Sequence, residues 1–276
     1  MASSNVHGPA RPRAGPITTQ FQFGPWTLTA VKSHILESEG TARERFEGQL
    51  DLPQVPEMVF AENVLRIQHT EGYGVEFNAL DALRRVDPHH DHFKVAVSQA
   101  WKEARSECEH IQDVVKPFDW TFTTDYKGTI IGDQIQVETT SERIDLEKLK
   151  VREKIHFYED IVLFEDELSD NGTSMMSVKI RVMPSSFFIL LRQFMRVDNV
   201  IVRVLDTRLY LEAEQNYMLR EHSCREKNIQ DLKVPAHVIT DPNELAQILP
   251  VSKEMNEKLV FPSTGGTKEE TDSAVR

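Results

Sequence analysis

Residues 178–220 read VKIRVMPSSFFILLRQFMRVDNVIVRVLDTRLYLEAEQNYMLR. This run contains the densest apolar segment of the chain, FFILL at 187–191, and a second segment rich in β-branched residues at 200–205. Turn-like residues at 183–186 and at 198–199 separate these segments from their neighbours. Short runs rich in Val, Ile and Phe between turn signals are typical of buried strands. The run therefore predicts the strands at the centre of a sheet.

Arginine recurs along the same run. Charged residues in strands usually alternate with core residues and face water, where they form local ion pairs. Here the arginines are unusually frequent for one sheet face, and a planar guanidinium suits carboxylates and anionic peptide groups. Two interpretations remain open, a solvated face with local ion pairs and a face that recognises a ligand. The arginines are Arg181, Arg192, Arg196, Arg203, Arg208 and Arg220.

The composition limits the classes of partner. The chain has 276 residues, of which 28% are charged, and a formal net charge of -12 with a pI near 5.3. Because nucleic acid binding needs a basic footprint, we expect no nucleic acid partner. No stretch reaches the roughly 18 consecutive apolar residues of a membrane span, and an acidic chain is repelled by anionic lipid. We therefore expect no membrane association.

The two cysteines, Cys108 and Cys224, lie far apart in the sequence and outside any C-x-x-C pattern. A secreted disulfide scaffold carries more cysteines, and the N-terminal residues lack the apolar segment of a signal peptide. We expect reduced thiols and a cytoplasmic location, with the nucleus as a second compartment.

Strand and helix signals alternate irregularly, without an internal repeat or a long linker. They predict a single α+β domain with a mainly antiparallel β-sheet core and flanking helices. The domain is expected to span 18–262. Residues 1–17 and 263–276, rich in small and polar residues, are predicted to be disordered tails.

Three local predictions follow from spacing and capping signals. Asn78 is expected to cap a short helix that contains Asp81 in its first turn. A long helix is predicted over 145–160, where an apolar stripe made of Leu146, Leu149, Val151 and Ile155 would pack on the core. The aromatic and Thr-rich residues of 117–138 predict a hairpin with a turn at 127–128.

Clusters that suggest catalysis are few. His89, His90 and His92 with Asp91 suggest zinc ligands, and the acidic run around 165–167 suggests paired carboxylates. The alternatives are a solvated loop and a charged strand end that discourages edge pairing. A metal-dependent hydrolase using His89, His90 and the acidic run therefore remains the alternative to a non-enzymatic protein. We expect no cofactor and no bound metal.

Long segments of the chain, in order, resemble the TIPRL family, the TOR signalling pathway regulator-like proteins. The likeness extends from about Phe21 to Pro262. The segments that carry it are FGPWTLTA (23–30), VPEMVF (55–60), NVLRIQH (63–69), EFNALDALR (76–84), KPFDWTFTTDYKGT (116–129), LFEDEL (163–168), SVKIRVMPSSFF (177–188), DTRLYLEA (206–213) and YMLRE (217–221). Such long ordered matches are more specific than any single short motif.

The resemblance implies a non-enzymatic regulator. Members of the family bind the catalytic subunits of type 2A protein phosphatases and of the related type 4 and type 6 enzymes. They hold these subunits in a low-activity state and link them to TOR signalling. Recognition includes the flexible C-terminal tail of the phosphatase, which docks into a cleft. A protein that is a monomer when free is expected.

The resemblance also assigns residues to the partner interface. It points to Asp81, Ile144, Val204 and Asp206, and it departs from the vertebrate pattern at Val204, a methionine there. At His222, after YMLRE, the vertebrate members carry an aromatic residue. From the chemistry of the residues themselves we add Arg181 and Arg208, as partners for an acidic tail with a free carboxylate. The predicted interface residues are thus Asp81, Ile144, Arg181, Val204, Asp206, Arg208 and His222.

Overall fold

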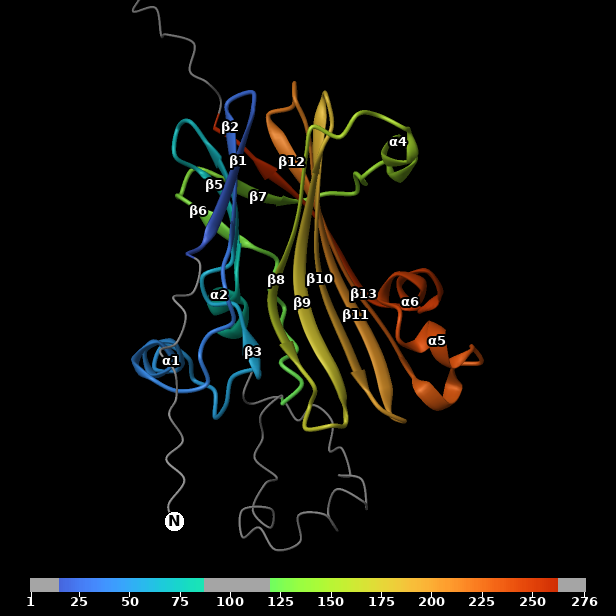
Figure 1. The fold of residues 1–276 in the computed structure, drawn as a ribbon. Helices are drawn as coiled ribbons and strands as arrows, with labels where there is room; N and C mark the ends of the chain where they lie inside the picture. Colours follow the sequence, from blue (N-terminus) through green and yellow to red (C-terminus); the bar gives the residue numbers. More distant parts are fainter. Residues whose placement is uncertain (1–14, 87–119, 263–276) are drawn as a thin grey trace, which may run out of the picture.

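The computed structural model describes residues 15–86 and 120–262, and its fold is α+β, as predicted (Figure 1). Two antiparallel sheets form its framework. The strands are β1 (Ile17–Phe23), β2 (Trp26–Lys32), β3 (Met58–Val59), β4 (Val64–His69), β5 (Gly74–Asn78), β6 (Thr129–Ile131), β7 (Gln136–Thr139), β8 (Phe157–Asp166), β9 (Gly172–Val182), β10 (Ser186–Val197), β11 (Ile201–Glu212), β12 (Tyr217–Asn228) and β13 (Val251–Val260). The helices are α1 (Thr41–Glu47), α2 (Ala79–Leu83), α4 (Leu146–Lys150), α5 (Ala236–Ile239), α6 (Pro242–Ile248) and a 3-10 turn at Ile229–Asp231.

The larger sheet is built around residues 178–220. Its eight strands follow the order β3-β8-β9-β10-β11-β12-β13-β7, in which β8 to β13 form an antiparallel meander. The turn at Asp198-Asn199 closes the β10–β11 hairpin, with Asn199 in the left-handed conformation that Asn tolerates. The prediction that residues 178–220 form buried strands is therefore confirmed.

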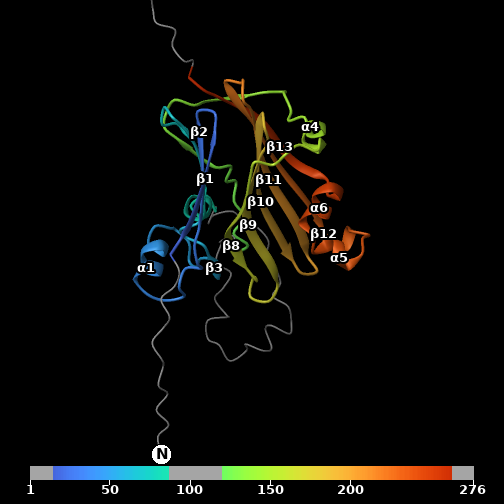
Figure 2. The same cartoon turned by 45° about the horizontal axis from the view of Figure 1, so that its top comes forward.

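The smaller sheet, with strand order β1-β2-β4-β5-β6, packs against one face of the larger one, called here the inner face (Figures 1 and 2). Alternate residues of its strands, including Leu28, Leu65 and Val75, join Val178 and Ile189 in the main hydrophobic core. All five side chains are nearly inaccessible to solvent. Because successive strand residues point to opposite faces, the same strands send polar side chains away from the core.

The opposite face of the larger sheet, called here the outer face, carries α4 near one end and α5 with α6 near the other (Figures 1 and 2). Asp241 caps α6 by accepting hydrogen bonds from Asn243 N and Glu244 N, and Pro242 occupies the first turn. Leu245 and Leu249 then pack on apolar side chains of β10 and β11.

The long helix predicted over 145–160 is wrong. Asp145 does cap a helix, but α4 ends at Lys150, and β8 begins at Phe157. Residues 151–156 belong to no helix or strand, and Leu146, Val151 and Ile155 are exposed. The spacing of the apolar residues is too irregular to give one apolar helical face, so these side chains do not pack together on the core.

The hairpin predicted over 117–138 is also wrong for its described part. Residues 120–128 form no strand apart from a single bridge between Thr124 and Val86. The second half of the predicted hairpin, residues 129–138, divides between the two sheets, because β6 pairs with β5 and β7 pairs with β13. The strand β13 had no counterpart in the sequence prediction. His89, His90, His92 and Cys108 lie outside the described residues.

Candidate functional site

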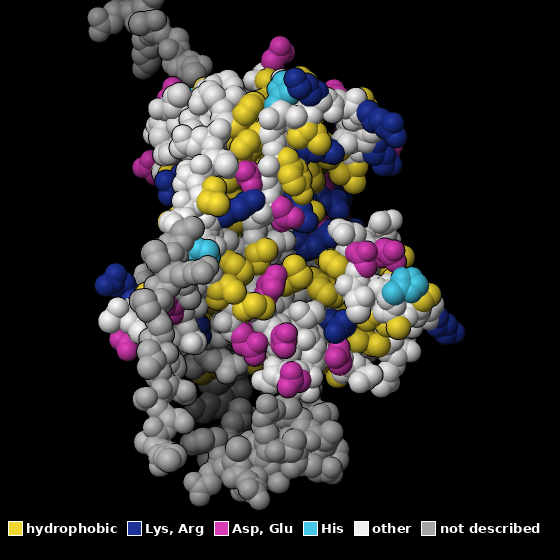
Figure 3. All heavy atoms as spheres, in the orientation of Figure 1, with side chains coloured by type: hydrophobic (Ala, Val, Ile, Leu, Met, Phe, Trp, Pro, Cys, Tyr) yellow, Lys and Arg dark blue, Asp and Glu magenta, His cyan; other side chains and the backbone are white. Residues whose placement is uncertain are grey.

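The outer face has a groove between α4 and α6. Figure 3 shows the face hollowed there, with Lys and Arg side chains in the hollow. Two neighbouring rows of cross-strand residues form its floor, and we call this surface the outer groove. One row is Lys179, Leu190, Arg208, Glu221 and Asn256, and the other is Ser177, Arg192, Asp206, Ser223 and Glu254.

A buried ion pair lies at the centre of the floor. Arg192 donates from Nε to Asp206 Oδ1 at 2.6 Å and from Nη2 to Asp206 Oδ2 at 2.7 Å. The side chain of Asp206 is 1% exposed. The remaining Arg192 nitrogen, Nη1, donates to Pro242 O and Asn243 Oδ1 at the start of α6. This pair joins two strands to one wall of the groove, and it engages all three nitrogens of the Arg192 guanidinium.

Glu221 holds the other wall. Its Oε1 accepts hydrogen bonds from Ile144 N at 2.8 Å and from Arg143 Nε at 3.2 Å. Ile144 itself is buried against Tyr210 and Leu219. The segment that leads to α4 is therefore fixed to the sheet by a carboxylate on the floor and by an apolar side chain beside it.

Arg208 is the cation of the floor with the weakest internal pairing. Its nearest carboxylates are Asp206, at 3.7 Å from Nη2, and Glu221, at 3.9 Å from Nη1. Within the described residues it makes no hydrogen bond, and its side chain is 22% exposed. Both neighbouring carboxylates already accept shorter hydrogen bonds from other donors. Arg208 thus has guanidinium N–H groups free to receive a carboxylate in two-pronged geometry.

Arg181 lies on the same face, beside a pocket of about 260 Å³. Its Nη2 donates to Leu149 O at 2.9 Å, while its buried Nε has no hydrogen-bond partner among the described residues. Tyr210 and Met183 form part of the pocket wall. A buried donor without an acceptor is costly, so an acceptor placed in this pocket would gain a hydrogen bond at little desolvation cost.

The remaining predicted residues lie in different places. Val204 is completely buried beneath α6, so it supports the groove wall and is not exposed in it. His222 is on the inner face, where its Nδ1 lies 2.8 Å from Thr207 Oγ1. Burial, reinforced by the charge of Lys127, lowers the pKa of His222 to about 4. Arg203 and Arg220 also point to the inner face, so the arginines do not all share one side of the sheet.

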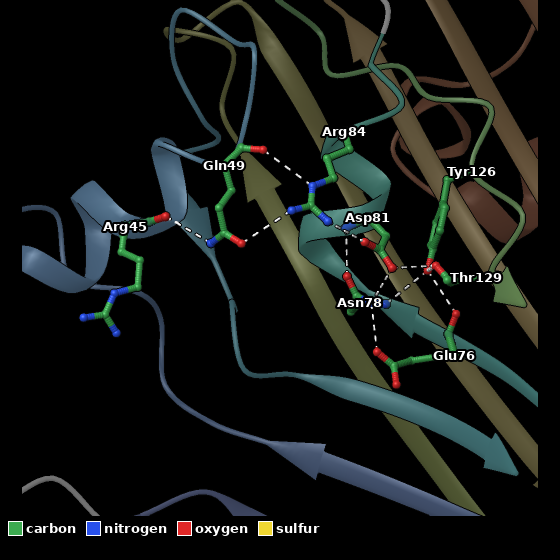
Figure 4. A network of polar contacts seen from close by, with 8 residues as sticks. All are labelled: Arg45, Gln49, Glu76, Asn78, Asp81, Arg84, Tyr126 and Thr129. Atoms are coloured by element: carbon green, nitrogen blue, oxygen red, sulfur yellow. Dashed lines mark hydrogen bonds and ion pairs between the residues drawn. The ribbon is translucent and has the colours of Figure 1, made fainter. Parts of the chain in front are cut away.

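Asp81 belongs to a polar network beside α2, on the far side of the larger sheet from the outer groove (Figures 1 and 4). Its carboxylate accepts hydrogen bonds from Thr129 Oγ1 at 2.6 Å and Asn78 Nδ2 at 3.0 Å, and Arg84 lies at 3.3 Å. Partial burial opposes ionisation, but these donors outweigh it and lower the pKa of Asp81. Asn78 Oδ1 also accepts from Asp81 N, which confirms Asn78 as the helix cap.

Sequence reasoning missed Arg192 as a member of the site, although a signal existed. The turn at 198–199 fixes the register of the β10–β11 hairpin and places Arg192 opposite Asp206. Arg143 and Glu221 had no such signal, because they meet at a separation of 78 residues. No group of three or more His, Cys, Asp or Glu side chains suited to a metal occurs within 15–86 and 120–262. In the same ranges no helix is long and apolar enough to cross a membrane.

Fold and site together define an α+β protein that presents a charged groove on the outer face of a large antiparallel sheet. The model of the TIP41-like family matches residues 58–233, and the chain belongs to this family. It is 54% identical over 245 residues to the human TIP41-like protein, a match that covers 88% of this chain and 89% of the relative. It is 36% identical over 264 residues to the type 2A phosphatase activator TIP41 of Saccharomyces cerevisiae, covering 86% of this chain and 73% of the relative. The corresponding protein of Schizosaccharomyces pombe, also named type 2A phosphatase activator, is 33% identical over 208 residues, covering 75% of this chain and 81% of the relative.

Proposed function

We propose that this protein is a non-enzymatic regulator that binds the catalytic subunits of type 2A protein phosphatases, and of the related type 4 and type 6 enzymes. The names of the two yeast relatives support the phosphatase as partner. The protein acts as a monomer in the cytoplasm, with the nucleus as a second compartment, and takes part in TOR signalling. The C-terminal tail of the catalytic subunit lies in the outer groove.

The loosely paired guanidinium of Arg208 is the observation that carries this proposal. A flexible tail ends in a carboxylate, and Arg208 offers donors for it on a floor whose other charges are already paired. The walls at Ile144 and α6 confine the chain on either side. Arg181, with its unpartnered Nε beside a pocket, supplies a second donor on the same face.

The test compares peptides that copy the phosphatase tail, with either a free or an amidated C-terminus. A charge-assisted hydrogen bond contributes about 1.5–3 kcal/mol, so Arg208→Ala should weaken binding of the free acid roughly tenfold or more. Amidation should weaken binding to the wild type by a similar factor but should have little further effect on Arg208→Ala. Arg66→Ala, which removes an exposed arginine of the smaller sheet, serves as the control.

Two outcomes contradict the proposal. If the wild type binds neither the peptide nor the purified catalytic subunit, the protein does not have this function. If the amidated and free peptides bind equally, the tail does not end at Arg208.

The binding lowers phosphatase activity in one of two ways. The protein either covers the metal centre of the enzyme or binds a conformation that holds the metals weakly, which requires tighter binding to the inactive form. The yeast relatives are named activators, so the direction of the effect is itself tested. Saturating protein should reduce hydrolysis of a small phosphate ester by the isolated catalytic subunit; an increase would assign activation to this chain as well.

A further inference from the structure

The segment between β7 and β8, residues 140–156, crosses the outer face from one side of the larger sheet to the other, and we call it the strap. It includes α4 and forms one wall of the outer groove (Figure 1). Its contacts reach four strands in turn: Thr140 N to Asn256 O on β13, Ile144 N to Glu221 Oε1 on β12, Lys148 Nζ to Glu212 Oε1 on β11, and His156 N to Val182 O on β9.

The strap is attached to the sheet by few apolar groups. Ile144 is buried, and Leu149 is half-buried beside it. Every other residue from Asp145 to His156 is exposed. The fold therefore leaves Leu146, Val151 and Ile155, the apolar residues of the predicted helical stripe other than Leu149, exposed to solvent.

Exposed apolar side chains concentrate on this segment. Leu146 is 42% exposed, Val151 62%, Ile155 49% and the adjoining Tyr158 54%. These are four of the nine large apolar side chains that are exposed within the described residues. Single exposed apolar residues are ordinary, but a group of them on one surface marks an interaction site.

The charge on the strap is opposite to that of the whole chain. Between Leu146 and His156 there are four cations and two carboxylates, in a protein with a net charge of -12. Figure 3 shows Lys and Arg side chains gathered over α4. Arg152 and Lys154 form no ion pair with any other described residue, whereas Lys148 and Lys150 do. The surface therefore suits an apolar patch that is bordered by acidic residues.

We propose that the exposed side of the strap is a second contact surface. It binds an apolar patch bordered by acidic residues on the folded body of the same partner whose C-terminal tail lies in the outer groove. This inference rests on the proposed function. A disordered tail alone loses conformational entropy on binding and gives modest affinity, whereas a linked second contact raises the affinity of the whole partner. The strap borders the groove, so one partner can reach both. The other wall of the groove, α6, does not combine exposed apolar side chains with cations, because its exposed Ile248 lies near the acidic side chain of Glu244.

The experiment separates the two contacts by using two probes. Binding of the purified type 2A catalytic subunit and of a synthetic peptide copying its C-terminal tail is measured for the wild type and for Leu146→Ser/Ile155→Ser, which leaves Val151 unchanged because it lines the pocket beside Arg181. We expect the variant to bind the subunit at least tenfold more weakly and the peptide with unchanged affinity. Arg152→Glu/Lys154→Glu should give the same split, with a smaller effect at high salt.

The control is Ile17→Ser/Ile35→Ser, which removes two exposed apolar side chains from the N-terminal part of the chain. It should bind both probes like the wild type. Because all the substituted side chains are exposed, every variant should unfold at the same urea concentration as the wild type.

The outcomes are distinguishable. Equal binding of the subunit by the wild type and the strap variant overturns the inference and leaves the proposed function intact. Parallel loss of the subunit and the peptide also overturns it, because the strap would then act only through the groove. If the wild type binds the peptide but gains nothing from the rest of the subunit, no second contact exists. If the wild type binds neither probe, the proposed function fails, and the inference fails with it.

Discussion

The buried ring of His222 should make the stability of this fold depend on pH in a defined direction. The residue is 6% exposed, and its Nδ1 lies 2.8 Å from Thr207 Oγ1. Burial and the nearby charge of Lys127 disfavour the imidazolium and lower the pKa from 6.5 to about 4. The folded protein therefore holds the ring neutral over a range of pH in which the unfolded chain is protonated.

The sign and size of the effect follow from linkage. As the pH falls, the unfolded chain takes up the proton first, so stability is present above a pH of about 6.5 and is lost as the pH approaches about 4. Between about pH 7.5 and about pH 5, this pKa difference corresponds to a loss of about 2 kcal/mol in the free energy of unfolding.

The assay is urea unfolding of the wild type and His222→Gln at both pH values. Glutamine keeps a group that can bond Thr207, so the variant should be less stable by about 1 kcal/mol at neutral pH. Its stability should then fall by about 2 kcal/mol less than that of the wild type on acidification. His237→Gln, which alters an exposed ring in α5, is the control. Parallel pH dependence of the wild type and His222→Gln would refute the reasoning.

Two further predictions concern the larger sheet. Asp206→Asn should lower the free energy of unfolding by about 3 kcal/mol in urea, because it leaves the guanidinium of Arg192 buried without its carboxylate; Asp160→Asn, in an exposed pair, should change it by less than about 1 kcal/mol, and equal losses would contradict this. Gly172→Ala should lower the melting temperature, since a Cβ there would lie 1.9 Å from the carbonyl oxygen of Arg196 and the end of the β9–β10 pair must shift; an unchanged melting curve would show that the turn yields without cost.

Local sequence signals located the centre of the fold correctly because strand periodicity and turn chemistry act over a few residues. The runs around 187–191 and 200–205 formed the central strands, and the turn at 198–199 closed their hairpin. Asn78, Asp145 and Asp241 each capped a helix, as their hydrogen bonds confirm. The helix predicted over 145–160 was too long, since the irregular apolar spacing gives no single helical face beyond α4.

For the candidate site as well, the sequence identified some residues but not their positions in the fold. The chemistry of the guanidinium group was sufficient to single out Arg181 and Arg208. The family resemblance pointed to Asp81, Ile144, Val204 and Asp206 but did not say where they lie in the fold. These six residues and His222 do not form one cluster: Asp81 and His222 lie away from the outer groove, and Ile144 and Val204 lie beneath its walls.

The sequence by itself determined the strand-rich α+β class, the helix caps and the supply of arginines, because each depends on neighbours a few residues apart. Only the tertiary structure decided which arginine of the outer groove is loosely paired. Arg192 is occupied by Asp206 across one hairpin and by the start of α6, about 50 residues further on, while Arg208 faces carboxylates that other donors already hold. The turn at 198–199 specifies the contact between Arg192 and Asp206, but the other contacts depend on which strands and walls meet in space, and no local pattern in the sequence specifies them.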